Sequence, residues 1–343
     1  MYQQRVTIYC APTADDRELV LTSPDSTRAL TFSGAIGDDA GGASDVTVTG
    51  GGLVNLFGAS GYSGTTVVGM GVLVAYHSNA LGSASGPTLV YSTGRTTDGG
   101  QFALAGGVTV AEPITLVGPG DGASGSYTRT LDAWSGTNTL SGTLTLTGTS
   151  GYRIGVSGAN AVLNVGLIRR STTGGGNLIV DPGAGRVLNI SEAIDNNNGD
   201  LICHGGGGSG LTVLMASSND LGYVRVQNDS SLKVTAPQAL SANRYLMIGQ
   251  GSGNTATGVG NDRGVFYLDA ANLAVNELIG YANGGSNASA THTRRVTSAT
   301  SGSKTLTVGY NGGTGSFDGV IEDGSGGGTT TLVKAGGGTQ TLT

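Results

Sequence analysis

Residues 46–56 read VTVTGGGLVNL, and residues 58–68 read GASGYSGTTVV. In the first stretch Val46 and Val48 alternate with threonines, three glycines follow, and a second apolar run begins at Leu53. Alternating apolar and polar residues are typical of a β-strand that buries one face. Glycine adopts the positive φ angles that tight turns require. The stretch therefore predicts short strands joined by glycine-rich turns.

The same pattern recurs along most of the chain. Apolar residues stand two positions apart at Val72/Val74, Val108/Val110, Ile114/Leu116, Leu144/Leu146, Leu178/Val180, Leu211/Val213, Val224/Val226, Phe266/Leu268 and Leu306/Val308. Glycine-rich runs lie between some of these pairs, at 174–176 and 205–208, and after the last of them, at 326–328. Because a helix would need apolar residues three and four positions apart, the sequence predicts an all-β chain.

The composition distinguishes between all-β architectures. The chain has 343 residues, of which 64 are glycine, about 19% where average usage is about 7%, and only 5% are aromatic. A sandwich or barrel of this length would be expected to contain more bulky core residues. In a solenoid, each coil has a thin interior that becomes a continuous core only when coils stack. We therefore expect a parallel β-helix (β-solenoid), with about 15 coils of about 20–25 residues each.

The balance of charge excludes several partners. The chain has 17 Lys and Arg against 23 Asp and Glu, so its formal net charge is −6. Its longest basic clusters are Arg169-Arg170 and Arg294-Arg295, which offer too few cations to displace counterions from a nucleic acid. An anionic membrane surface is an unsuitable partner for the same reason. No apolar run reaches the roughly 18 residues of a membrane-spanning helix.

The cysteines and the first residues bear on the compartment. Cys10 and Cys203 are far apart in the sequence, so one long-range disulfide and two free thiols both remain open. The lack of a disulfide framework favours two thiols. Residues 1–10 do not show a charged region followed by an apolar one, so they are not a signal peptide. We expect either another export element or a chain that is part of a longer protein.

Residues 46–82 resemble the autotransporter-associated β-strand repeat, also called the passenger-associated transport repeat. That repeat has a glycine-rich Leu-x-Leu strand, a Gly-x-Asn-x-Tyr-x-Gly turn, Thr-Thr-Val and Gly-x-Leu strands and an Ala-Leu-Gly turn. In this chain the first turn is 58–64, with Ser60 in place of the asparagine, and the last turn is 80–82. A second, partial match covers 315–321 and 331–342 and stops at Thr343, where the next turn would follow.

The resemblance implies a right-handed β-helix that is exported to a bacterial cell surface. It supplies no catalytic residues, so none are carried over to this chain. Because the second match stops within a repeat, the resemblance also implies that a chain of this family would continue beyond residue 343. The middle of the chain shares with the repeat only its short alternating strands and glycine-rich turns.

The two ends of the chain differ in composition. Residues 1–30 are poor in glycine and carry several charged residues: Arg5, Asp15, Asp16, Arg17, Glu18, Asp25 and Arg28. We expect residues 1–30 to form an N-terminal cap, or an arm that pairs with another copy by strand addition, and residues 31–343 to form the β-solenoid. The other end shows no cap. An uncapped end that repeats its own pattern favours head-to-tail stacking, which makes a filament when it does not close.

The histidines and cysteines suggest no metal site. The three histidines are His77, His204 and His292, and only His204 has a neighbouring candidate ligand, Cys203. Neighbouring residues in a strand point to opposite faces, so this pair would not chelate a zinc ion unless the chain turned at Gly205. The acidic pairs Asp15-Asp16 and Asp38-Asp39 are typical of solvated turns.

The acidic residues allow a weaker, enzymatic alternative. Residues 195–200 read DNNNGD, but Gly199 stands where a calcium loop needs an oxygen ligand, which favours a polar turn with stacked asparagines. The densest acidic group contains Asp181, Glu192, Asp195 and Asp200, with Arg186 nearby. Polysaccharide-cleaving enzymes need such carboxylates on one face. Trp134 and the 12 tyrosines could stack on sugars, although isolated tyrosines in turns more often pack on the surface.

These observations lead to one predicted function and two alternatives. We expect a non-enzymatic, extracellular structural or adhesive β-solenoid of a bacterial cell surface that assembles head to tail into a fibre. The alternatives are a carbohydrate-active β-helix, similar to a polysaccharide lyase or hydrolase, and a capped monomeric passenger that binds a sugar. We predict no catalytic, cofactor-binding or metal-binding residues and no cofactor. The expected partners are other copies of the chain and a surface polysaccharide or matrix.

Overall fold

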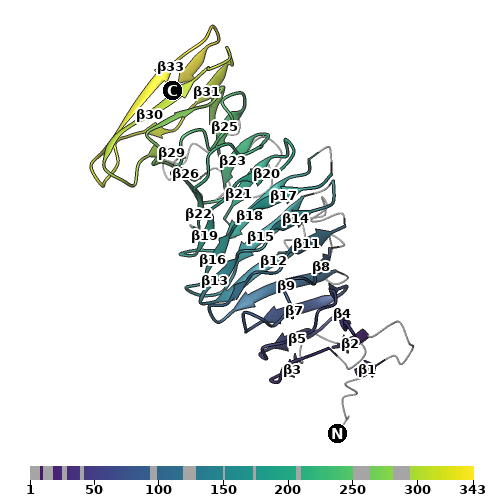
Figure 1. Ribbon diagram of the computed structural model, residues 1–343. Helices are drawn as coiled ribbons and strands as arrows, with labels where there is room; N and C mark the ends of the chain where they lie inside the picture. Colours follow the sequence, from purple (N-terminus) through teal and green to yellow (C-terminus); the bar gives the residue numbers. More distant parts are fainter. Residues whose placement is uncertain are drawn as a thin grey trace. The chain divides into compact units, whose positions relative to one another are not determined.

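The computed structural model shows an all-β protein (Figure 1). It describes residues 8–10, 18–24, 29–38, 42–92, 99–118, 129–149, 151–172, 175–205, 210–249, 263–280 and 294–343, with the backbone alone for 8–10. The described residues form 34 β-strands and no helix, so none of them belongs to a helix that could cross a membrane. The chain divides into two compact units, residues 1–173 and 174–343.

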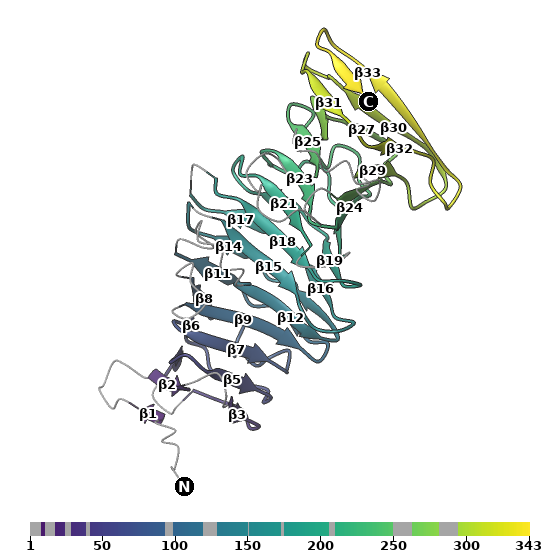
Figure 2. The same ribbon diagram turned by 180° about the vertical axis from the view of Figure 1, so that it is seen from behind.

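The first unit contains three sheets of stacked strands (Figures 1 and 2). Sheet A has the order β1 (Ile8–Cys10), β2 (Glu18–Thr22), β4 (Asp45–Thr49), β6 (Thr66–Val68), β8 (Thr88–Tyr91), β11 (Ile114–Val117), β14 (Leu144–Leu146) and β17 (Ile168–Arg170). Sheet B has the order β3 (Ala29–Phe32), β5 (Leu53–Leu56), β7 (Gly71–Ala75), β9 (Gly100–Ala105), β12 (Leu131–Ser135) and β15 (Tyr152–Val156). Sheet C contains β10 (Thr109–Val110), β13 (Thr137–Leu140) and β16 (Val162–Val165).

The second unit contains the strand β20 (Ile194–Asp195) and four sheets. Sheet D has the order β18 (Leu178–Pro182), β21 (Leu201–His204), β23 (Val224–Gln227), β25 (Tyr245–Ile248) and β28 (Glu277–Gly280). Sheet E has the order β19 (Val187–Ile190), β22 (Leu211–Leu214), β24 (Ser230–Val234), β26 (Gly264–Leu268), β29 (Arg294–Thr297) and β32 (Val320–Ile321). Sheet F contains β27 (Asn272–Ala274), β30 (Gly302–Val308) and β33 (Gly328–Lys334), and sheet G contains β31 (Gly315–Phe317) and β34 (Gln340–Leu342).

The strand pairings confirm the predicted parallel β-solenoid, with about 10 turns. The predicted number of about 15 coils is wrong, because the turns between strands vary in length and many are long. Leu53 pairs with Val72, whereas Ser230 pairs with Gly264, so the second coil takes up far more of the chain than the first. Strand geometry fixes the spacing between rungs but not the length of the loops, so loops absorb the extra residues. The right-handedness of the coil stays a prediction.

Inward-facing side chains of successive rungs stack in register. In sheet A, the inward residues of five consecutive rungs are fully buried: Val46, Val48, Thr66, Val68, Thr88, Val90, Ile114, Leu116, Leu144 and Leu146. The residues between them face outward and are partly exposed, as Thr47, Thr115 and Thr145 show. The predicted alternation is therefore confirmed, and burial of these ladders supplies about 25 cal/mol per Å² of apolar surface.

Buried asparagine side chains hold several of the turns. The Asn138 Oδ1 accepts hydrogen bonds from the backbone N–H groups of Gly107 and Val108, at 3.1 Å each, and its Nδ2 donates to the Ser135 carbonyl at 2.9 Å. Asn196 is also fully buried, in a turn where Asn197 and Asn198 have positive φ angles. The expected polar asparagine turn is confirmed around Asn197 and Asn198, and the Asn196 Nδ2 donates to the carbonyls of Gly176 and Asp200 at 3.4 Å each. Stacking of the asparagines stays a prediction.

Part of the segment 1–30 belongs to the parallel ladder. β2 pairs with β4 in parallel from Glu18↔Asp45 to Thr22↔Thr49, and β3 begins at Ala29 and pairs with β5. β1 pairs antiparallel with β2 and occupies its outer edge. A cap or an arm within residues 1–30 stays a prediction, with β1 as the strand that would serve it.

Gly50 is a position at which the backbone requires glycine. Its φ is +85°, and a Cβ there would lie 2.3 Å from the Ser23 carbonyl oxygen. We expect Gly50→Ala to lower the free energy of unfolding by more than about 2 kcal/mol, because the left-handed conformation and the contact both oppose a side chain. Urea titration followed by circular dichroism measures the change.

Gly61→Ala is the matched control, because Gly61 has no positive φ and nothing lies within 4 Å of the added Cβ. This control is expected to leave the stability unchanged or to raise it by about 0.4–1 kcal/mol. Equal effects of the two substitutions would contradict the assignment of Gly50 as a constrained turn residue.

Candidate functional site

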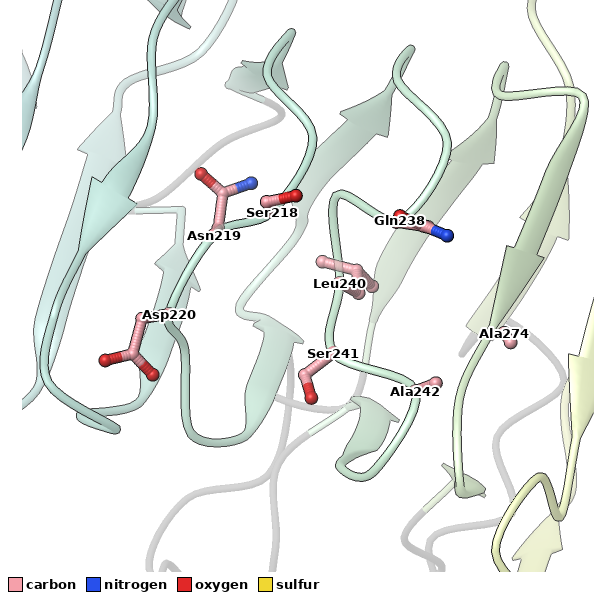
Figure 3. A pocket seen from close by; sticks show the side chains of 8 residues that line it. All are labelled: Ser218, Asn219, Asp220, Gln238, Leu240, Ser241, Ala242 and Ala274. Atoms are coloured by element: carbon pink, nitrogen blue, oxygen red, sulfur yellow. The ribbon is translucent and has the colours of Figure 1, made fainter.

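A shallow groove of about 430 Å³ crosses three rungs of the second unit (Figure 3). Ser218 and Asp220 line it from the turn before β23, and Gln238 and Ser241 line it from the segment between β24 and β25. Ala274 of β27 completes the third rung. Figure 3 shows Ser218 and Gln238 along one side and Asp220 and Ser241 along the other, with Leu240 between them.

Two groove residues have an unusual backbone conformation. Ser218 has a φ of 67° and Gln238 a φ of 59°, and the Ser218 N–H donates a 3.1 Å hydrogen bond to the Gln238 carbonyl. The other described non-glycine residues with positive φ are Asn160, Asn197, Asn198, Asn228 and Asp229. Asparagine and aspartate tolerate this region far better than serine or glutamine. Both unusual residues therefore lie side by side in the groove.

The floor of the groove is rigid. Leu240 is 3% exposed, and Asn219 is 7% exposed. The Asn219 Oδ1 accepts from the Ile194 N–H at 2.7 Å, and its Nδ2 donates to the carbonyls of Ala239 (2.8 Å) and Ala216 (3.1 Å). These bonds join neighbouring rungs. The Asn219 amide is therefore occupied by backbone groups, and the residues along the rim of the groove are the ones available to bind a ligand.

A tyrosine pair flanks the groove. The rings of Tyr223 and Tyr245 stack at 3.7 Å between centroids, with 9° between their planes, and the Arg244 guanidinium lies 5.9 Å from the Tyr223 centroid. Asp200 fixes this pair, since its Oδ1 accepts the Tyr223 N–H at 3.0 Å and its Oδ2 pairs with Arg225 at 2.9 Å. Ring stacking and the guanidinium contact make this a rigid surface feature.

The register relates the tyrosine pair to the groove. Tyr245 pairs with Glu277, and the residue after Tyr223 pairs with the residue after Tyr245. In each rung, the residue three positions earlier lines the groove; these residues are Asp220, Ala242 and Ala274. The groove and the tyrosines are therefore two tracks that share two rungs, separated by three residues that bend at Gly222 on one rung and turn at Ala242 and Asn243 on the next.

The four acidic residues grouped in the sequence lie in different environments in the structure. Asp200 is held by Arg225, as described above, and Glu192 is exposed. Asp181 is 1% exposed, with its Oδ1 3.9 Å from the His204 Nδ1. Asp195 forms an isolated parallel bridge with Asp220, which brings these two acidic residues to adjoining rungs. Asp220 could not be recognised from the sequence, because its pairing with Asp195 depends on the strand register.

The prediction that Cys203 and His204 point to opposite faces of their strand is confirmed. Cys203 is a free, fully buried thiol whose pKa is raised by burial, whereas His204 lies on the outer face. Among the described residues, no three His, Cys, Asp or Glu side chains are placed to hold a metal ion. The His77 Nδ1 accepts the Asn79 N–H at 3.1 Å, within a turn. His292, the side chain of Cys10, Asp15, Asp16 and Asp39 lie outside the described residues.

Two other polar candidates serve the fold. Asp38 binds the N–H groups of Ser44 and Ser63 at 2.9 Å each, and these bonds, with the Ser63 hydroxyl, lower its pKa. The Trp134 Nε1 donates to Asp132 Oδ2 at 3.1 Å, and Trp134 packs against the buried cluster of Val74, Ala103 and Ala105. This favours surface packing over sugar stacking for this ring.

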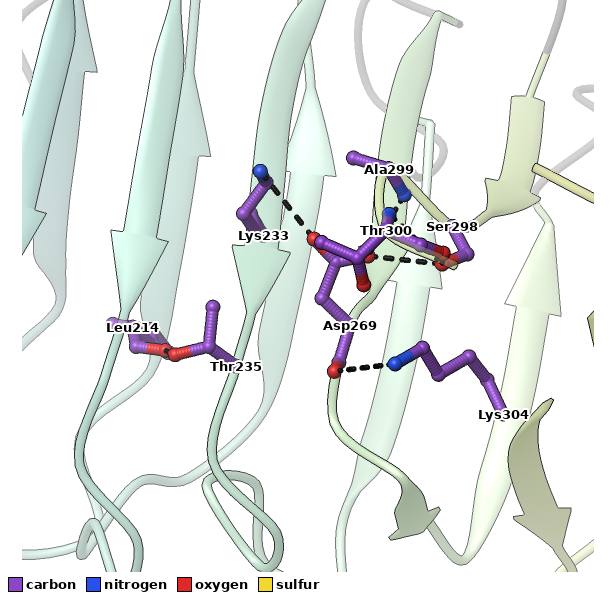
Figure 4. Close-up of polar contacts among 8 residues, drawn as sticks. All are labelled: Leu214, Lys233, Thr235, Asp269, Ser298, Ala299, Thr300 and Lys304. Carbon is purple, nitrogen blue, oxygen red and sulfur yellow. Dashed lines mark hydrogen bonds and ion pairs between the residues drawn. The ribbon is translucent and has the colours of Figure 1, made fainter. Parts of the chain in front are cut away.

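Asp269 forms a second polar cluster (Figure 4). Its Oδ1 accepts hydrogen bonds from the Ala299 N–H (2.7 Å) and the Ser298 hydroxyl (3.0 Å), and its Oδ2 lies 3.3 Å from Lys233 Nζ. Burial acts to raise the pKa of Asp269, but these hydrogen bonds and the lysine outweigh it, so the pKa is lowered. The carboxylate is therefore committed to holding the turn between β29 and β30.

Glu112 is a buried carboxyl group of the first unit with an incomplete set of hydrogen bonds. It is 3% exposed, and its Oε1 accepts a 2.6 Å hydrogen bond from the Thr88 hydroxyl. Its Oε2 is buried and has no hydrogen-bond partner among the described residues. Burial raises the pKa of Glu112 from 4.5 to about 8. Below pH 8 the folded protein therefore keeps this carboxyl protonated.

Replacing Glu112 should change the dependence of stability on pH. Below pH 4.5 the carboxyl is protonated in both states, so it imposes no penalty. Between pH 4.5 and 8 the unfolded chain releases the proton and the folded chain keeps it, so stability falls by about 1.4 kcal/mol per pKa unit, about 5 kcal/mol in total. Glu112→Gln removes this loss, and we expect it to stabilise the protein at pH 8 and to have little effect at pH 4.

Thermal unfolding at a series of pH values measures the difference. Glu192→Gln, which neutralises an exposed glutamate, is the control and should leave the profile unchanged. A Glu112→Gln profile that runs parallel to the wild-type profile would show that Glu112 does not carry the buried proton.

Comparisons of the chain with models of protein families, with curated proteins and with solved structures found no match. The fold assignment therefore rests on the strand register, and any function has to be argued from the residues of the surface and the outer strands.

Proposed function

We propose that this chain is a non-enzymatic structural and adhesive β-solenoid of a bacterial cell surface, and that it assembles end to end through its outer strands. The resemblance of residues 46–82 to the autotransporter-associated repeat supports the location. Two of the four acids that a carbohydrate-cleaving enzyme would use support the non-enzymatic part, since Asp200 is neutralised by Arg225 and Asp181 is buried. The assembly would use β33 and β34, which are edge strands of their sheets.

An uncovered continuation of the core carries the proposal. Leu306 pairs with Leu332, and Phe317 pairs with Leu342. Leu306 and Phe317 are at most 1% exposed, whereas Leu342 is 52% exposed and Leu332 is partly exposed. The apolar ladder therefore continues into a rung on which no described strand stacks. A further rung would bury these leucines as β33 and β34 bury their predecessors.

The backbone of these strands is also prepared for a further rung. The N–H groups of Ala335 and Thr343 donate to the carbonyls of Val308 and Phe317, at 2.9 and 3.1 Å. In a parallel ladder, alternate residues bond to the same neighbour, so the backbone groups of Leu332 and Leu342 point the other way. Such a row of unpaired N–H and C=O groups is a template for another strand.

The outer strands lack the usual protection against pairing. Natural edge strands are blunted by lysines, prolines or bulges. β33 reads GTTTLVK and β34 reads QTL, so Lys334 is their one charged residue. The Lys334 Nζ donates to the Gly336 carbonyl at 3.0 Å, which folds it back on its own turn. We propose that a second copy of the chain can occupy this edge, because its rungs carry the same alternating ladder.

A charged edge should prevent the assembly. We expect the wild-type chain to form filaments in negative-stain electron microscopy, and Leu332→Lys/Leu342→Lys to remain as discrete particles at the same concentration. Lysines at these positions would be buried without partners in a stacked rung. Circular dichroism should show that the double variant keeps its β-structure.

Val333→Lys provides the control on the same strand. Val333 is 40% exposed and alternates with Leu332, so its side chain faces solvent and the substitution should leave the filaments intact. Discrete wild-type particles at every concentration would contradict the proposal, as would filaments of the double variant.

A further inference from the structure

The groove on the second unit holds two residues in a conformation that glycine or asparagine would adopt more easily. Ser218 and Gln238 occupy equivalent places on consecutive rungs and are joined by a backbone hydrogen bond. A left-handed backbone is costly for serine or glutamine, because the Cβ approaches the following carbonyl oxygen, whereas glycine has no Cβ. Strained residues of this kind gather at functional sites. Their side chains both border the groove in Figure 3, so a role in binding would account for the strain.

We propose that this groove binds a neutral glycan. Its rim offers the hydroxyls of Ser218 and Ser241, the amide of Gln238 and the carboxylate of Asp220. Sugar hydroxyls both donate and accept hydrogen bonds, so they match a rim that contains donors and acceptors together. The volume of about 430 Å³ lies in the lower part of the range of about 300–1,000 Å³ for small-ligand sites.

The charges around the groove favour a neutral ligand over an acidic one. Asp220 lines the groove, Asp195 lies on the adjoining rung, and Glu277 pairs with Tyr245 of the tyrosine track. The nearby guanidinium groups are engaged: Arg225 pairs with Asp200, and the Arg244 Nη2 donates to Asn198 Oδ1 at 2.6 Å. A uronic acid would meet the carboxylates of Asp220 and Glu277 here, whereas a neutral hexose would meet hydrogen-bonding groups.

The two-track arrangement favours an oligosaccharide over a single sugar. The groove crosses three rungs, about 10 Å along the stack, and on two of those rungs a tyrosine of the pair follows a groove residue by three positions. Tyr223 is 36% exposed, so its ring edge remains accessible beside the groove. The inference rests on the adhesive part of the proposed function, for which it names the ligand class, and it is independent of the assembly through β33 and β34.

Binding should be measured on the non-assembling background Leu332→Lys/Leu342→Lys, by calorimetric titration of hexasaccharides of glucose, of N-acetylglucosamine and of galacturonic acid. We expect at least one of the two neutral hexasaccharides to bind, and the galacturonate to bind at least about tenfold more weakly. Ser218→Gly/Gln238→Gly should weaken binding of the neutral ligand at least about tenfold while Tm stays equal or rises, because glycine relieves the strained backbone.

Asn160→Gly is the matched control. Asn160 also has a positive φ, 57°, but it lies in the first unit, so the substitution relieves a similar conformation and should leave binding unchanged. The proposal is overturned if neither neutral hexasaccharide binds, if only galacturonate binds, or if the double glycine variant binds as tightly as its parent. Binding without wild-type filaments would reject the assembly alone, and filaments without binding would reject the groove alone.

Discussion

The stacking of one rung on the next is the interaction on which the rest of this structure depends. Leu116 pairs with Val90 on one side and with Leu146 on the other, and all three side chains are fully buried. Removing either neighbour would expose half of this contact together with a row of backbone hydrogen-bonding groups. A rung therefore gains its stability from the neighbours on which it stacks, and the stability of the whole is a sum of contacts between nearest neighbours. Because of the same dependence, an uncovered rung is prone to pair with a further strand.

The thin core also decides which polar groups the interior accepts. Asn138 is fully buried, but its oxygen and nitrogen atoms bind backbone groups of its own turn and the neighbouring one, so the amide replaces hydrogen bonds that the turns have lost. Glu112 is buried to a similar degree, yet only one of its oxygens is bonded among the described residues. A carboxylate in that position would be a charge without a partner, so the interior selects the protonated form.

Much of the fold was predictable from local pattern, and the exceptions have physical reasons. The alternation at Val46 and Val48 indicates strands because periodicity is a local property. Thr66 and Thr88 were not recognisable as core residues, since their hydroxyls are satisfied by Tyr62 and Glu112, which lie outside the strands and meet them only after folding. The coil number was missed for a related reason: loop length is free to vary while the rung spacing is fixed.

The groove shows why a candidate site on a solenoid is harder to predict than the fold. Side chains fill the interior, so ligands have only the outer faces and turns available, and residues from three rungs must combine there. The residue types serine and glutamine at positions 218 and 238 do not indicate a left-handed backbone. If these turns served only to reverse the chain, glycine or asparagine would serve better, as they do at most of the other described left-handed positions. The presence of a serine and a glutamine there, with both side chains bordering the groove, is the reason we assign the groove a ligand.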